Sequence, residues 1–388
     1  MTGIDTKPLA RPGAAPGPAP QIAPYRLMVV DDSAVIRGLL IRSLEADPEI
    51  RVVASASNGE MALTAIKRHD VEIVVLDIEM PVMDGLTALP KLLAAKPSIK
   101  VIIASTLTRR GADISMRALA AGAADYVTKP GASVLTSADD FKRELTAKVK
   151  ALGQACRGTA SQQRPTRQPA PRAAETSGGE ETRRTFTLRT AGREAPEVVA
   201  IGSSTGGPQA LFRLAAALRR SVTQPIFITQ HMPATFTTIL AEHIGRASGF
   251  PTSEGADGEP VRQGHVYVAP GDFHMTVEAR AGGDKMIRLS KSPPENFCRP
   301  SVDPMLRSLV TAYGSRILCL ILTGMGQDGL KGGRSVVETG GTVIAQDEAT
   351  SVVWGMPGAV ANAGICSAVL PLDEIAPYVA SFVARAAR

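Results

Sequence analysis

Short apolar runs alternate with amphipathic, helix-like segments over two long stretches of this chain. Within residues 25–150 the apolar runs fall at 25–30, 51–55, 73–76, 101–104 and 125–127; within residues 196–388 they fall at 197–201, 225–229, 265–269, 316–322 and 341–345. Strands that alternate with helices form parallel sheets through crossover connections. The sequence therefore predicts two α/β domains, each with a doubly wound and mainly parallel sheet, whose ligands bind beyond the carboxyl ends of the strands.

The boundaries of these two domains follow from changes in composition. Residues 151–195 lose the periodicity and gain Gln, Arg, Pro, Thr and Gly, which predicts a flexible linker. Residues 1–24 are rich in Pro, Ala and Gly and predict a disordered N-terminal extension. We therefore expect an extension over 1–24, a first domain over 25–150, a linker over 151–195 and a second domain over 196–388.

The net charge of +6 does not indicate a nucleic-acid partner, because most of it lies outside the expected domains. The linker alone holds eight arginines against four glutamates, and no basic, aromatic-interleaved stripe occurs within the domains. No apolar stretch reaches the roughly 18–20 residues needed to cross a bilayer. The four cysteines form no CxxC pair, which argues against a zinc site or a disulfide framework. We expect a reduced, cytoplasmic protein that does not bind nucleic acid and does not insert into a membrane.

Carboxylates follow the strands of the first domain at the points where those strands end. Asp31 and Asp32 follow the first apolar run, Asp77 the third, Ser105 the fourth and Lys129 the fifth. A single acidic residue at such a position often only caps a helix. Three carboxylates brought to one edge of a sheet repel one another unless a hard cation such as Mg²⁺ lies among them. One of them could then attack a phosphoryl group and carry it covalently.

The segments VVDDSAVIRGLL, VLDIEMPVMDG, ASTLT and YVTKPG closely resemble the receiver domain of response regulators. The resemblance covers the first domain and implies a flavodoxin-like fold that is phosphorylated with the help of Mg²⁺. It implies these roles: phosphate acceptor Asp77; Mg²⁺ ligands Asp31, Asp32, Asp77 and the backbone carbonyl of Glu79; switch hydroxyl Ser105; switch aromatic Tyr126; phosphate-contacting lysine Lys129.

The second domain opens with an apolar run that stops at GSSTGG, followed by a helical pattern. A serine between glycines on a strand-to-helix turn is a typical way to expose a nucleophilic hydroxyl, here that of Ser204. The same loop could instead bind an anion at a helix N-terminus without catalysis. A nucleophilic serine needs a general base, and His231 also stands directly after an apolar run, whereas His274 is a weaker candidate.

The acid that orients the base should also follow a strand. Asp328 comes just after the strongly apolar run RILCLILTG, which favours it over Asp303 and Asp272, while Asp347 remains possible. The surrounding GMGQDG also spells a dinucleotide-binding G-x-G-x-x-G. That alternative places the negative charge of Asp328 in a phosphate-binding loop and puts the motif late in its domain, so it is a minority interpretation.

The order Ser, His, Asp along the chain differs from that of α/β-hydrolases. The segments AIGSSTGG, ITQHMP, RPSVD, ILTGMGQDG and AQDEATSVVWGMP resemble the catalytic domain of chemotaxis protein-glutamate methylesterases over residues 196–385. The resemblance implies a Rossmann-like catalytic domain with Ser204 as nucleophile, His231 as base and Asp328 as orienting acid. It also implies an oxyanion hole at the backbone of Met325 and Thr205, and no cofactor in the esterase site.

The combined resemblance implies hydrolysis of glutamate 5-O-methyl esters on methyl-accepting chemoreceptors. A histidine kinase is the implied phosphate donor, and glutamine deamidation on the same receptors is compatible with the same acyl chemistry. We expect the unphosphorylated first domain to cover Ser204. The alternatives are a phosphorylation-gated binding module without activity and a dinucleotide-dependent enzyme.

Overall fold

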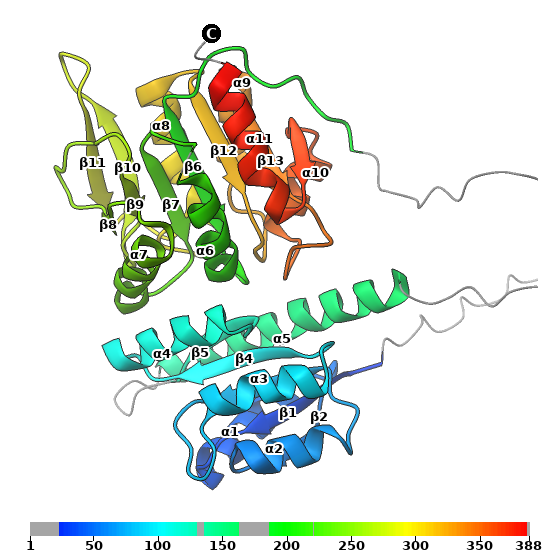
Figure 1. Cartoon of the computed structure of the whole chain (residues 1–388). Coiled ribbons are helices and arrows are strands. Elements are labelled where there is room, and N and C mark those ends of the chain that lie inside the picture. Colours follow the sequence, from blue (N-terminus) through cyan, green and yellow to red (C-terminus); the bar gives the residue numbers. More distant parts are fainter. Residues whose placement is uncertain (1–22, 130–135, 163–185, 220, 386–388) are drawn as a thin grey trace, which may run out of the picture.

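A computed structural model describes residues 23–129, 136–162, 186–219 and 221–385 of the chain. Two α/β bodies lie one above the other in it, each built around its own sheet (Figure 1). The predicted extension over residues 1–24 lies almost wholly outside the described residues. No helix in the described part of the chain has the length and apolar character that a bilayer crossing requires.

The first domain has a five-stranded parallel sheet in the order β2-β1-β3-β4-β5. Its strands are β1 Tyr25–Val30, β2 Ile50–Ala56, β3 Ile73–Asp77, β4 Lys100–Ser105 and β5 Asp125–Thr128. Its helices are α1 Ala34–Glu45, α2 Gly59–Ile66, α3 Gly85–Ala95, α4 Arg109–Ala120 and α5 Thr136–Gln162. The apolar runs form strands because both faces of the sheet are covered by helices, and β3 is buried at every position.

Polar side chains start the first four helices of this domain. Each accepts a hydrogen bond from the backbone N–H three residues ahead, which satisfies one of the free donors of a helix N-terminus. The capping residues are Ser33, Asn58, Asp84 and Thr108. These caps fix where the loops after β1, β2, β3 and β4 end, and so fix the edge at which the acidic residues gather.

The second domain has a seven-stranded sheet in the order β14-β13-β12-β6-β7-β9-β8, in which every pair of neighbours is parallel. Its strands are β6 Val198–Ser203, β7 Ile226–Gln230, β8 Thr252–Glu254, β9 Val266–Val268, β12 Ile317–Ile321, β13 Thr342–Gln346 and β14 Ala368–Leu370. An antiparallel pair, β10 His274–Ala279 and β11 Lys285–Ser290, forms a separate small sheet. The prediction of doubly wound, mainly parallel domains is confirmed.

The helices of the second domain are α6 Gly207–Leu218, α7 Ala234–Ser248, α8 Val302–Tyr313, α9 Leu330–Glu338, α10 Met356–Asn362 and α11 Leu372–Arg385. The strand order reverses beside β6, which has β12 on one side and β7 on the other. Such a reversal opens a crevice at the carboxyl ends of the strands, where ligands of this kind of fold bind. The candidate residues Ser204, His231 and Asp328 follow β6, β7 and β12.

The structure shortens the predicted linker at both ends. Residues 151–162 continue helix α5, because Leu145, Val149 and Leu152 recur at helical spacing and are buried against the sheet. At the other end the backbone N–H of Arg189 donates to the carbonyl of Cys366 at 2.9 Å, and Phe186 packs on Trp354. Residues 163–185 lie outside the described residues.

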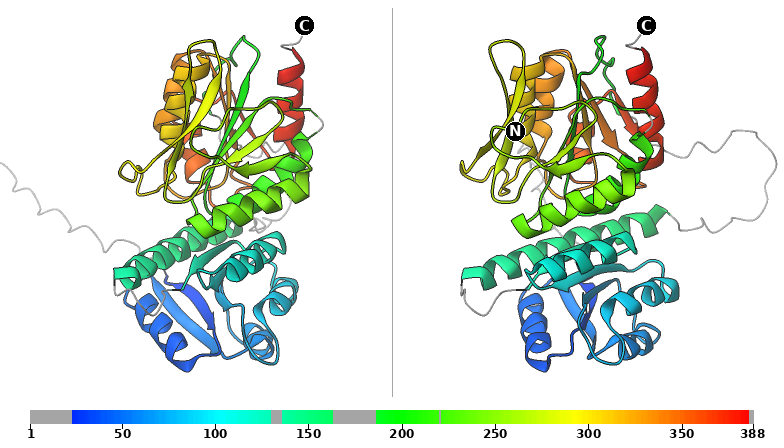
Figure 2. Two further views of the ribbon diagram at one scale, coloured as in Figure 1. Left: turned by 90° about the vertical axis from the view of Figure 1, so that its left-hand side faces the viewer. Right: turned by 60° about the vertical axis from the view of Figure 1, so that its left-hand side comes forward.

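The two domains meet through α4 and β5 of the first and α6 and α7 of the second (Figures 1 and 2). The ring of Tyr126 stacks on Phe236 of α7, with ring centroids 4.4 Å apart and planes 10° apart. Asp113 of α4 accepts a hydrogen bond from His243 of α7 at 2.9 Å. The contact therefore joins an apolar stack to an ion-pairing rim, as protein–protein contacts commonly do.

Candidate functional site

The first polar cluster lies at the carboxyl edge of the five-stranded sheet. Asp31, Asp32 and Asp77 each offer a carboxylate oxygen within 4.8 Å of the others. Lys129 joins two of them, with its Nζ 2.7 Å from Asp31 Oδ2 and 2.8 Å from Asp77 Oδ1. Burial, with the nearby Asp31 charge, raises the pKa of Asp77 in spite of Lys129. Three hard oxygen donors with unbalanced negative charge suit a divalent cation such as Mg²⁺.

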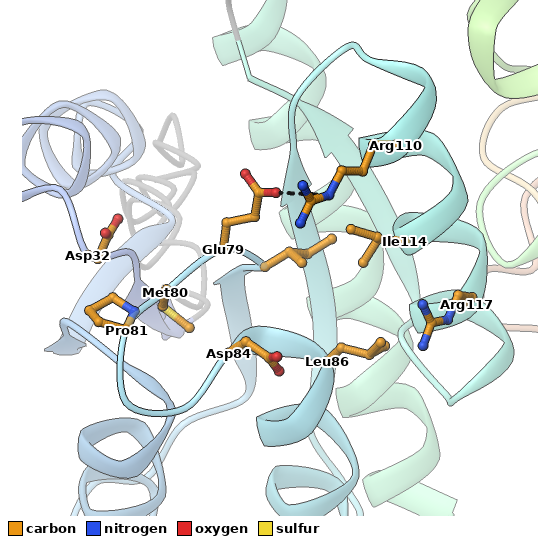
Figure 3. Close-up of a pocket in the computed structure, with 10 residues that line it drawn as sticks. Asp32, Glu79, Met80, Pro81, Asp84, Leu86, Arg110, Ile114 and Arg117 are labelled. Atoms are coloured by element: carbon orange, nitrogen blue, oxygen red, sulfur yellow. Dashed lines mark ion pairs between the residues drawn. The ribbon is translucent and has the colours of Figure 1, made fainter.

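The other predicted residues of this domain, Ser105, Tyr126 and Glu79, have different surroundings. Ser105 is buried, and its hydroxyl donates to the carbonyl of Gly111 in α4 at 3.1 Å, so it faces helix α4. Tyr126 is buried in the contact between the domains, where Lys148 lies 5.0 Å from its ring centroid. The Glu79 carboxylate points to Arg110 at 3.6 Å (Figure 3), and the predicted metal-binding role of its backbone carbonyl stays a prediction.

A cleft of about 550 Å³ adjoins the acidic cluster. It is bordered by the exposed Asp32, the β3–α3 loop and the outer face of α4, and its polar walls include Arg110 and Arg117 (Figure 3). Of the three clustered carboxylates, Asp32 borders the cleft.

The second polar cluster lies at the carboxyl ends of β6, β7 and β12. The Asp328 Oδ2 atom lies 2.7 Å from His231 Nε2, and Asp328 is 1 % exposed. The structure therefore brings together the histidine and aspartate that follow two different strands. His231 lies directly beside the serine loop, since its backbone N–H donates to the carbonyl of Ser203 at 3.3 Å.

The N-terminus of α8 holds the Asp328 carboxylate. The backbone N–H groups of Val302 and Asp303 donate to it at 2.6 and 3.1 Å, and that of Gly329 donates at 2.9 Å. Amide donors and the positive end of a helix both favour an ionised carboxylate. Burial by itself would raise the pKa of Asp328, but His231 and these amides more than offset it, so its pKa is lowered.

The partners of His231 raise its basicity. Burial by itself would lower the pKa of the imidazole, but Asp328 and the Cys298 thiol raise it to about 10. The Cys298 sulfur lies 3.4 Å from His231 Nδ1, the ring nitrogen that Asp328 does not use. Within the described part of the chain, the Ser204 hydroxyl forms no hydrogen bond with His231. In this state Asp328 orients the base, but the base is not engaged with the serine.

The serine loop is shaped by close packing of backbone on backbone. Ser204 donates its N–H to the carbonyl of Thr323 at 3.0 Å, and Gln230 donates from Nε2 to the carbonyl of Ser204 at 2.9 Å. A β-carbon at Gly324 would lie 2.9 Å from Ser204 Cβ, so only glycine allows this approach. Met325, the next residue and a predicted oxyanion donor, is thereby held beside the nucleophile.

The start of α6 supports the same arrangement. Gly206, at φ 78°, caps the helix without a side-chain hydrogen bond. The backbone N–H of Gly207, the first residue of the helix, donates to the carbonyl of Ser204 at 2.7 Å, which ties the serine loop to the start of α6. The Thr205 hydroxyl points the other way and donates to Asp125 of the first domain at 2.7 Å. The residue after the serine therefore belongs to both the loop and the domain contact.

The alternative candidates for the base and the orienting acid, His274 and Asp347, form hydrogen bonds outside the catalytic cluster. His274 starts β10, is buried, and accepts a hydrogen bond from the backbone N–H of Ser301 on Nδ1. Asp347 accepts from the backbone N–H and hydroxyl of Thr350. The Asp328 carboxylate accepts a hydrogen bond from the backbone N–H of Gly329 within the GMGQDG turn. Because the carboxylate carries negative charge and occupies this amide, the turn does not suit a pyrophosphate.

Sequence reasoning missed the polar network around Asp328. Asn296 donates from Nδ2 to Asp328 Oδ1 at 2.7 Å and to Asp303 Oδ2 at 3.0 Å, and so bridges two buried carboxylates. Asp303 is fully buried, and burial raises its pKa. Asn296 and Cys298 lie in a turn with no strand-end position, so no periodic pattern marked them.

Comparisons with known proteins match each domain to a protein family. Residues 27–138 match the response regulator receiver domain family, and residues 199–379 match the family described as CheB methylesterase. A protein-glutamate methylesterase/protein-glutamine glutaminase of Azospirillum brasilense is 63% identical over 373 residues, which are 94% of each chain. A relative with the same activities in its name, from Paramagnetospirillum magneticum, is 60% identical over 93% of this chain and 96% of its own.

One solved structure is also similar to part of this chain. The CheB methylesterase catalytic domain of Thermotoga maritima is 42% identical to this chain, covers 49% of it and is itself covered completely, with a TM-score of 0.47.

Proposed function

Because this chain belongs to the family of receiver-linked protein-glutamate methylesterase/protein-glutamine glutaminases, we propose that it hydrolyses glutamate 5-O-methyl esters on methyl-accepting chemoreceptors and releases methanol. The chain is accordingly a carboxylic ester hydrolase. The observation that carries the proposed mechanism is the hydrogen bond of 2.7 Å between His231 and Asp328 beside the carboxyl end of β6. Deamidation of receptor glutamines would use the same acyl chemistry.

The proposed reaction begins with proton transfer from Ser204 to His231. Asp328 occupies Nε2 of the imidazole, so Nδ1 is the nitrogen that takes the serine proton. Ser204 Oγ then attacks the ester carbonyl, methanol leaves with the proton from His231, and water resolves the acyl-enzyme by the reverse sequence. Since Cys298 lies on Nδ1 in the resting state, the imidazole must exchange the thiol for the serine hydroxyl first.

Backbone amides are the proposed stabilisers of the oxyanion. Thr205 stands at the start of α6, and Met325 follows the glycine that packs on Ser204. Fixed donors of this kind act on charge that develops in the transition state, and removing one typically lowers kcat by about 10²–10³-fold. The esterase site needs no metal in this scheme, because the backbone supplies the positive potential.

We further propose that phosphorylation of Asp77 controls access to this site. Asp31, Asp32 and Asp77, with the Glu79 carbonyl, would hold Mg²⁺, which when bound neutralises the carboxylates and the incoming phosphoryl oxygens. Lys129 is placed to bind the phosphate on Asp77, and a histidine kinase is the proposed donor. The contacts Thr205–Asp125 and Phe236–Tyr126 support direct coverage of the serine loop by the unphosphorylated receiver.

Methanol release from methylated chemoreceptors tests the catalytic assignment. Replacing Ser204 with Ala removes the nucleophile, so we expect release to fall by at least about 10³-fold. Ser203→Ala is the matched control, because Ser203 is buried and its hydroxyl, among the described residues, donates to Gln230 and not to the catalytic residues. Near-normal release by Ser204→Ala would contradict the proposed nucleophile.

A further inference from the structure

A short turn, residues Glu295–Cys298, lies against the catalytic residues and carries an unpartnered aromatic ring at its tip. The backbone N–H of Cys298 donates to the carbonyl of Glu295 at 3.0 Å, and Asn296 and Phe297 between them have φ values of 53° and 63°. Two successive positive φ angles closed by such a bond are the signature of a type I′ turn. Phe297 is 102% exposed.

The turn is fixed to the catalytic centre on both sides of Phe297. Asn296 donates to Asp328, and the Cys298 thiol contacts His231, at the distances given above. Glu295 is clamped by Arg307 through two hydrogen bonds of 2.8 and 2.6 Å. A ring between these anchored residues has a defined place beside the site, although no residue in the described part of the chain covers it.

The identity of the residue at the tip is itself informative. The second central position of a type I′ turn favours glycine, because side chains with a β-carbon rarely adopt the left-handed region. A bulky aromatic residue there is an outlier that needs an explanation outside local structure. An exposed aromatic ring on a rigid support is also the usual form of a binding anchor.

Other exposed groups near the site are compatible with a protein substrate. Met325, 38% exposed, lies in the loop that packs on Ser204, so a second apolar side chain faces solvent beside the nucleophile. Lys291 is exposed in the segment before the turn, and Arg299, half-buried after it, donates to the carbonyls of Lys291 and Ser292 at 3.2 Å; neither side chain has a carboxylate partner within the described residues. Each hydrolysed ester leaves a carboxylate on the substrate, which these cations would attract.

We propose that Phe297 is a docking residue for the protein substrate: its ring packs against apolar side chains that flank the esterified glutamate, and so places the ester at Ser204. This inference rests on the proposed function and adds a specificity-determining residue to it. Since Phe297 is fully exposed while the two domains are in contact, the receiver does not cover it, and docking can precede opening of the serine loop.

The test uses the full-length protein, phosphorylated with a small phosphodonor, and two substrates. One is a methylated receptor fragment followed by methanol release, and the other is p-nitrophenyl acetate, which is too small to reach Phe297. Phe297→Gly removes the ring and installs the residue that the turn favours, so the turn should persist. Phe297→Tyr keeps the ring, and Leu188→Ala removes an exposed apolar side chain from the segment beside β14, at the far edge of the sheet.

For Phe297→Gly we expect KM on the receptor fragment to rise about tenfold, as for the loss of an interface anchor, with kcat little changed. Its kcat/KM on the small ester should stay within about twofold of wild type, and the Tyr and Leu188→Ala variants should resemble wild type on both substrates. An unchanged receptor KM would overturn the docking role. Equal losses on both substrates would also overturn it, since the turn would then only position His231.

Two further outcomes are distinguishable. If wild type cleaves the small ester but releases no methanol from methylated receptors, the proposed function fails and the docking role fails with it. If Phe297→Gly changes the sedimentation coefficient with no change in receptor KM, the ring serves contact between copies of the chain, and the docking role is overturned while the proposed function stands.

Discussion

At the scale of single residues, the site depends on how Asp328 and His231 set each other's charge. Asp328 is buried and His231 largely so, and burial opposes both charges, yet the pKa of Asp328 is lowered and that of His231 is raised to about 10. Five donors satisfy the carboxylate, namely His231, Asn296 and three backbone amides. The result is an imidazole that is well oriented but protonated at neutral pH.

A raised pKa has a definite consequence for the pH dependence. Only neutral His231 can accept the serine proton, so the rate on a small ester should keep rising with pH above neutrality, as the imidazolium loses its proton. Asp328→Asn removes the principal cause of the raised pKa, so the rise should move to lower pH while the maximal rate falls by about 10³–10⁴-fold. A profile of kcat/KM between pH 5 and 10 measures both effects.

Asp347→Asn is the control for that profile, because Asp347 also follows a strand but its carboxylate, within the described part of the chain, accepts hydrogen bonds from Thr350 alone. Its profile should match wild type. The assignment of Asp328 would be contradicted if the rise of kcat/KM with pH moved to lower pH in Asp347→Asn. It would also be contradicted if this rise stayed at the wild-type pH in Asp328→Asn.

At the scale of elements, helix α4 joins the phosphorylation site to the domain contact. Its first turn receives the Ser105 hydroxyl through Gly111, and two residues further along Asp113 meets α7. On α7, His243 lies 2.9 Å and Arg246 lies 3.8 Å from Asp113. A shift at Ser105 therefore acts on the same helix that carries the ion pairs.

Reversing the charge on α4 should loosen this contact. Asp113→Lys places an ammonium group opposite His243 and Arg246, so we expect the unphosphorylated esterase rate to rise about threefold to tenfold, less at high salt. The pair is partly exposed, which keeps the effect modest. Adding Arg246→Glu should restore the low rate. Arg110→Ala, whose partner Glu79 lies in the same domain, is the control.

At the scale of the whole molecule, the proposed regulation is the relief of a contact between two independently built domains. With Mg²⁺ and a small phosphodonor, wild type should gain at least about tenfold in ester hydrolysis, within the usual range of coupling between sites. Asp77→Asn should show no increase in the rate of ester hydrolysis, because the acceptor carboxylate is gone.

The isolated domain 196–388 should hydrolyse the ester faster than the unphosphorylated full chain, without a phosphodonor. If that fragment were no faster than the unphosphorylated whole, coverage by the receiver would be the wrong mechanism.

Much of the fold could be predicted because strands buried on both faces are apolar throughout. Each of the ten apolar runs contains or overlaps an observed strand. Short or partly exposed elements escaped the pattern: β8 and β14 have three residues each, and the hairpin β10–β11 is half-exposed. The first twelve residues of the predicted linker, 151–162, belong to helix α5. The outer face of this helix is polar, so its composition resembles that of a linker, although Leu145, Val149 and Leu152 are buried at helical spacing.

The sequence by itself determined two doubly wound sheets and the polar residues at their strand ends, because period and position along a strand are local properties. The sequence therefore predicted Ser204, His231 and Asp328 as catalytic candidates, but not the distances between their side chains. Only the tertiary structure decided which atoms meet: Asp328 on Nε2, Cys298 on Nδ1, and Asn296 between two buried acids. It also decided that Thr205 reaches Asp125 across the domain contact. Contacts between residues far apart in sequence depend on packing and loop geometry, which leave no periodic trace in the chain.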